Sequence, residues 1–212
     1  MAILKKAKIL VTVEGCDVAR LKASIGGGEV TSHALVANLI WPRGAIAKKG
    51  TAQVCRLRQG VMAEAAWGDR VLFKEDVEGR FAVQVSVSEA TDGDRLEAFL
   101  RSVAGTLLSA TGEFYAAELP GAPLRKMARA PVDYLAKEIG KMPASRIMAE
   151  GMVDLAPKDI SDGMRLTIPL KAAQTQYVTR KKMKRGRMES SKEAVVKKGE
   201  ACGEMTLAIE VL

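Results

Sequence analysis

Apolar residues recur at every second position in several stretches of this chain, and this periodicity constrains its fold more than any other feature. In the stretch FAVQVSVS the apolar members are Phe81, Val83, Val85 and Val87. Successive side chains of a strand point to opposite faces, so the pattern predicts a strand with one buried face. A weaker alternation precedes it at 71–78, and Glu78-Gly79 predicts a turn between the two. Residues 71–88 are therefore predicted to form a β-hairpin.

The same period appears near both ends of the chain, at 8–13, 164–170 and 205–211. Pro169 cannot donate to a ladder, so the strand that contains it is predicted to lie at an edge or to end there. Three further stretches, VTSHALVANLIWP, TAQVCRLR and VMAEAAW, are predicted as strands although their alternation is less regular.

The middle of the chain has a helical period instead. After Asp94, which is suited to cap a helix, apolar residues follow at spacings of three and four up to Leu108. A second short helix is predicted for APVDYLAKEIGKMP, where Pro131 suits the first turn and Gly140 ends the helix.

Strands therefore bracket the helices and do not alternate with them, which argues against a doubly wound parallel sheet. We predict a mainly β fold, an antiparallel β-sandwich formed by one domain over residues 1–212. Its expected Greek-key order is similar to that of C2-type and jelly-roll sandwiches, a resemblance of topology. A helical insertion at 92–148 and a basic loop or hairpin extension at 179–200 complete the predicted organisation.

Positive charge is concentrated in one segment of the chain. The net charge is +8, and the segment from Arg180 to Glu200 carries nine cations against three glutamates. The other 191 residues therefore contribute only +2. The densest cations are Arg180, Lys181, Lys182, Lys184, Arg185 and Arg187. A local patch of this kind attracts anionic surfaces over about 8 Å at physiological salt.

The N-terminal stretch does not have the pattern of a signal peptide, and no apolar run reaches the roughly 18 residues of a membrane span. Cys16, Cys55 and Cys202 are an odd number of widely separated cysteines, which indicates a reducing compartment and mostly inert thiols. We therefore expect an intracellular, cytoplasmic protein without a transmembrane segment.

Candidates for catalysis and cofactor binding are few. His33 is the only histidine, and its neighbour Ser32 would point to the opposite face of a strand, so the two do not predict a nucleophile–base pair. We expect His33 to be a packed or partly exposed histidine without a catalytic role. Neither a zinc pattern nor a phosphate-loop motif is present, and Gly26–Gly28 are interpreted as a connector. We predict no catalytic residue, no metal site and no cofactor.

Whether the aspartates near the loops bind calcium is not decided by the sequence. Asp92-Gly93-Asp94 is explained by a turn and a helix cap, although Asp17, Asp69 and Asp76 would join it if the fold brought them together.

The basic segment has two interpretations, a solvated loop that keeps a neighbouring edge strand unpaired, or an electrostatic docking site. We predict a non-enzymatic interaction module, a structural subunit of a larger assembly, which contacts an acidic protein partner through the six cations. Binding of nucleic-acid phosphates or of anionic lipid is the alternative, and an enzyme with an unrecognised site is a third hypothesis.

Overall fold

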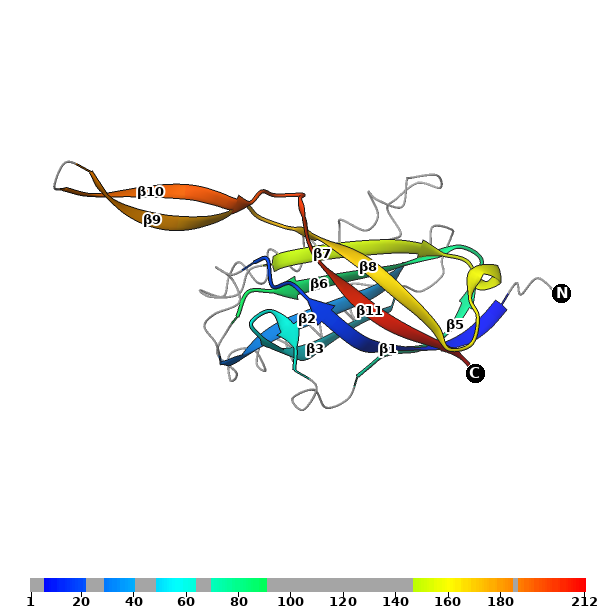
Figure 1. The fold of residues 1–212 in the computed structure, drawn as a ribbon. Coiled ribbons are helices and arrows are strands. Elements are labelled where there is room, and N and C mark those ends of the chain that lie inside the picture. The colour runs from blue at the N-terminus through cyan, green and yellow to red at the C-terminus, as the bar shows by residue number, and fades with distance from the viewer. Residues whose placement is uncertain (1–5, 22–28, 41–48, 64–69, 91–146, 185–186) are drawn as a thin grey trace.

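The computed structural model describes residues 6–21, 29–40, 49–63, 70–90, 147–184 and 187–212. Within these ranges the chain forms strands and a short 3-10 helix, shown in Figure 1. The elements are β1 (Lys6–Asp17), β2 (Val30–Ile40), β3 (Lys49–Arg58), β4 (Val61–Met62), β5 (Val71–Glu78), β6 (Phe81–Ser88), β7 (Ile147–Leu155), η2 (Pro157–Asp159), β8 (Met164–Ala172), β9 (Gln176–Lys184), β10 (Arg187–Val196) and β11 (Ala201–Val211).

The main sheet closes on itself as an antiparallel barrel of eight strands. From β1 the ring passes through β11, β8, β7, β6, β2, β3 and β4 and returns to β1. The pairing of β1 with β11 is long, from Ile9↔Val211 to Asp17↔Glu204. On the other edge of β1, β5 pairs along residues 6–12 and β4 pairs at Asp17. The side-chain amide of Gln53 on β3 also donates to the carbonyl of Val71 on β5.

The predicted sandwich, with its C2-like or jelly-roll comparison, is therefore wrong. The β1–β11 and β4–β1 pairings join the two ends of the strand order, whereas an open sandwich would leave two separate sheets. The predicted helical insertion at 92–148 is not supported either. Residues 91–146 lie outside the described residues, and the final two residues of the prediction, Ile147 and Met148, begin strand β7.

Alternating aliphatic side chains fill the barrel, and a bulge shifts the alternation of β1 by one residue. Ile9, Val11 and Val13 are buried, and the register with β11 then shifts between Val13 and Gly15. The extra residue of a bulge reverses which positions face inward, so Cys16 is buried in the core where strict alternation would turn it outward.

The predicted strand at 81–88 exists, but its burial differs from the expectation. All eight residues of β6 are buried, including Ala82, Gln84, Ser86 and Ser88 on the face away from the core. The alternation therefore separates large apolar side chains from small or polar ones, both of them shielded from solvent.

The predicted hairpin at 71–88 is also corrected. Both strands form, but β5 pairs with β1, whereas β6 pairs with β2 and β7. Gly79, with a φ of 68°, lies in the turn between β5 and β6, which pair with different strands. The edge position predicted for the Pro169 strand is wrong as well, because β8 lies between β11 and β7. Its ladder with β7 involves only Lys171 and Ala172, so Pro169 interrupts no pair there.

Strands β9 and β10 form a separate two-stranded sheet that projects from the barrel (Figure 1). We call this hairpin, residues 176–196, the arm. It leaves the barrel after β8 and returns to it at β11. No helix among the described residues is long and apolar enough to cross a membrane.

Candidate functional site

The arm contains the basic residues that the sequence singled out. Arg180, Lys181, Lys182 and Lys184 lie on β9 and Arg187 begins β10, while Arg185 lies outside the described residues. The whole arm carries seven cations and two carboxylates, whereas the other described residues carry fourteen of each. The arm is therefore a strongly positive projection on a barrel whose described charges balance.

The base of the arm is fixed by hydrogen bonds to the barrel. The amide of Ala172 donates to the carbonyl of Glu200 at 2.9 Å, and the amide of Gly199 donates to the carbonyl of Ala172 at 2.8 Å. The Thr175 hydroxyl accepts the amide of Lys198 at 3.2 Å. Val196, at the end of β10, is buried in the core. Because an isolated two-stranded hairpin is marginally stable in water, these contacts with the barrel are expected to support the base of the arm.

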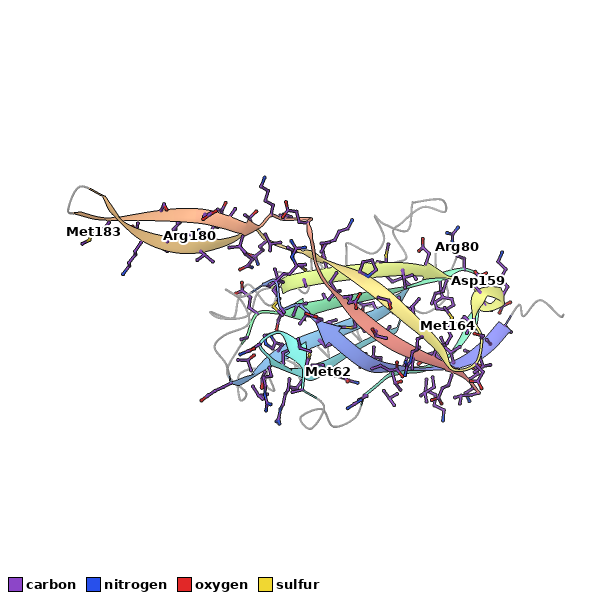
Figure 2. The ribbon with its side chains drawn as sticks, viewed as in Figure 1. Met62, Arg80, Asp159, Met164, Arg180 and Met183 are labelled. Atoms are coloured by element: carbon purple, nitrogen blue, oxygen red, sulfur yellow. The ribbon has the colours of Figure 1, made fainter. Side chains whose placement is uncertain are left out.

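The arm also exposes apolar side chains, which the charge pattern alone did not predict. Tyr177 is 56% exposed, Met183 76%, Val195 46% and Val178 38%. Elsewhere in the described chain the large apolar residues with comparable exposure are Val30, Val61 and Leu212. Figure 2 shows Met183 toward the free end of the arm, beyond Arg180. Binding surfaces combine apolar and charged contacts, and the arm exposes both kinds of side chain.

The two faces of the arm differ in their chemistry. Alternation along β9 assigns Tyr177, Thr179, Lys181 and Met183 to one face, and the register sets Ala194, Lys192 and Ser190 opposite the first three. We call this the apolar–lysine face. On the other face Arg180 forms an ion pair with Glu193, with 2.9 Å between Nε and Oε2. The register also sets Lys182 opposite Glu189 in the ladder. Acidic residues thus accompany the cations of the second face, while the described residues of the apolar–lysine face include no carboxylate.

A groove of about 250 Å³ lies on the barrel near the base of the arm. Its lining includes Glu14, Asp17, Val61, Met62, Glu204 and Thr206. Asp17 and Glu204 are directly opposite each other in the β1–β11 ladder and both are exposed, an arrangement in which like charges repel. Arg165 pairs with Glu14 at 2.9 Å, and the guanidinium of Arg20 donates to the carbonyl of Ala201 at 2.7 Å.

His33 is packed in the interior, one of the two environments expected for it. Its side chain is fully buried, and Nδ1 lies 2.9 Å from the carbonyl of Ser88 while Nε2 lies 2.8 Å from the hydroxyl of Thr31. A carbonyl only accepts, so Nδ1 carries the proton. Burial keeps the imidazole neutral, so Nε2 accepts, and the Thr31 hydroxyl donates to it rather than to the carbonyl of Leu57, which lies 3.3 Å from the same oxygen. Burial lowers the pKa of His33, and the hydrogen bond to Ser88 offsets part of that shift.

Acidification is therefore expected to destabilise the fold through His33. The lowered pKa keeps the folded imidazole neutral, while the unfolded chain takes up a proton below a pH of about 6.5, so stability falls from that pH downward and levels off below the folded-state pKa. Urea unfolding at several pH values between neutral and mildly acidic measures the slope. A His33→Gln variant, which cannot take up the proton, should have a flatter profile. An equal slope in both proteins would contradict this role.

The three cysteines are buried free thiols. Burial raises the pKa of Cys55, with a further contribution from nearby Cys16, and burial raises the pKa of Cys202 to about 11. Since the thiolate is the reactive form, Cys55 and Cys202 are poor nucleophiles in the folded protein.

The described residues do not gather as a metal site. No group of three or more His, Cys, Asp or Glu side chains in the described ranges is placed to hold an ion. Asp17 pairs with β11, whereas Asp76 pairs with Lys8 toward the opposite end of β1, so these two aspartates are apart. Asp69, Asp92 and Asp94 lie outside the described residues. Neither a protein-family model nor a curated protein sequence matches this chain.

Proposed function

We propose that this protein is a non-enzymatic interaction subunit that contacts an acidic protein partner through its arm. The observation that carries the proposal is the combination on the arm of a positive excess with exposed Tyr177 and Met183, on a barrel whose described charges balance. Partner encounter accelerates with a field of this kind, and exposed apolar side chains then supply contact area.

Nucleic acid is the second candidate, because a two-stranded β-ribbon is an element that the major groove of B-DNA admits. Phosphate binding would account for the cations. It does not account for the carboxylates within the arm, such as Glu193 beside Arg180, which weaken attraction to phosphates. The two candidates separate by salt dependence, since duplex binding loses about 0.9 log units of affinity per log unit of salt for each phosphate neutralised.

The test replaces the six cations of the sequence analysis, Arg180, Lys181, Lys182, Lys184, Arg185 and Arg187, with a neutral Ser/Gly/Asn mixture. We expect most partner binding to be lost, while each substitution shifts stability by less than about 0.5 kcal/mol. Pull-down from native lysate, with identification of the bound proteins, and the melting transition are measured on the same sample.

A matched control neutralises six exposed barrel cations, Lys8, Arg56, Arg58, Lys74, Lys158 and Lys171. This control removes the same charge but leaves the arm intact, so it should retain the partner. Undiminished binding by the arm variant, or equal loss in the control, would show that the arm is not the contact surface. Unfolding of the arm variant would show that the segment supports the barrel.

A further inference from the structure

We infer that the partner is a second copy of this chain, whose acidic groove at Asp17, Val61 and Glu204 receives the apolar–lysine face of the arm. This inference rests on the proposed function and names the partner for it. Two surfaces of one chain carry complementary chemistry.

The arm provides the first of these surfaces. Met183 is 76% exposed near its free end, and Lys181 precedes it by two residues on the same strand face. Apolar and cationic groups therefore lie next to each other, about 7 Å apart along the strand. The described residues of this face include no carboxylate to satisfy Lys181.

The groove provides the second surface. Val61 is 47% exposed and, together with Met62, gives the groove an apolar wall, while Asp17 and Glu204 supply two adjacent carboxylates. A lysine between two carboxylates that face each other across a ladder would relieve their repulsion. In the inferred contact Met183 packs against Val61 and Met62. Lys181 then lies between the carboxylates of Asp17 and Glu204, so the apolar and the charged groups of both surfaces are paired.

The contact must form between copies. The arm extends away from its own barrel, whereas the groove lies at the barrel near the base of the arm, so Met183 is remote from the Met62 of its own chain (Figure 2). A reciprocal two-fold exchange would set two positive arms side by side, which their repulsion disfavours. One arm in the groove of the next copy is a heterologous contact, which propagates as a ring or a filament.

Sedimentation of the purified chain over a range of concentrations tests the inference. Wild-type protein should form species larger than a dimer, and the association should weaken as salt rises. Lys181→Glu should weaken self-association by about tenfold or more because it places a carboxylate against Asp17 and Glu204. Arg180→Glu makes the same change of charge on the opposite face and should weaken it much less.

A complementation experiment distinguishes this specific contact from non-specific association. One variant has residues 176–196 replaced by a short turn, which leaves the groove but no arm. The other carries Asp17→Lys and Glu204→Lys, which leaves the arm but reverses the groove. Each alone should be monomeric, and their mixture should form a complex of one copy of each and nothing longer.

The inference fails if the wild-type chain remains monomeric at low salt, if Arg180→Glu and Lys181→Glu act equally, or if the two variants do not combine. If self-association fails but the arm still captures a different protein from lysate, the proposed function stands without the inference. If neutralising the six cations changes no binding, the proposed function fails as well. Binding of short duplex DNA with a steep salt slope, without self-association, would overturn the inference in favour of nucleic acid.

Discussion

Gly203→Ala is expected to reduce the free energy of unfolding by about 3 kcal/mol or more, at or beyond the upper end of the usual cost of overpacking. A Cβ at this position would fall on the carbonyl oxygen of Asp17 and lie 2.8 Å from its carbonyl carbon and 3.0 Å from the Cα of Val18. These are backbone atoms of the strand that closes the barrel, and they cannot rotate away as a side chain does. The melting temperature should fall by roughly 6–12 °C.

Gly15→Ala is the matched control, because Gly15 lies in the same β1–β11 ladder. A Cβ there would meet the Cβ of Thr206 at 3.7 Å, an ordinary van der Waals distance. Stability should be unchanged or rise by up to about 1 kcal/mol, since alanine reduces the freedom of the unfolded chain. Equal melting temperatures for the two variants would contradict the close approach of β11 to β1.

Phe81→Ala is expected to cost about 3–5 kcal/mol, the usual range for truncating a fully buried aromatic side chain. Phe81 is 0% exposed and belongs to the core of the barrel. Tyr177→Ala removes a ring of similar size from the arm, where the residue is 56% exposed, and should change stability by less than about 0.5 kcal/mol. Denaturant titration measures both variants.

The same pair of variants separates folding from binding. Tyr177→Ala should weaken partner binding while the barrel melts as in the wild type, because Tyr177 contributes contact area only on the arm. A large loss of stability in Tyr177→Ala would mean that the arm is part of the cooperative unit of the barrel.

Period-two alternation located β1, β5, β6, β8 and β11, because it reports which residues share a face of a single strand, whereas β7 begins within the predicted helical insertion and was missed. It says nothing about which strands are neighbours, and this is where the sandwich prediction failed. The stretches 71–78 and 81–88 are adjacent in sequence and joined by a glycine, so they resembled a hairpin, but β5 pairs with β1. The ring depends on β1 meeting β11, a pairing between the two ends of the described chain that a local pattern does not encode.

The sequence predicted the charge of the candidate site but not the arrangement of its side chains. Net charge is visible in any sequence, so the basic segment was found. The division of that segment into two faces requires its strand register, which sets Lys192 opposite Thr179 and brings Glu193 to Arg180. Tyr177 and Met183 are exposed because the arm leaves the barrel, and the sequence alone does not show that it does so.

Because β1 and β11 close the ring, the barrel cannot be completed until β11 has been synthesised. The residues that pair with Ile9 and Val11 are Val211 and Ile209, which are among the last described residues to leave the ribosome. β1 can pair with β5 early, but its other edge stays open until translation reaches β11. Long-range pairings of this kind slow folding and expose unpaired strand edges in the meantime. We therefore expect the nascent chain to depend on chaperones until β11 has emerged, and a chain stopped before residue 201 to aggregate rather than to form a smaller barrel.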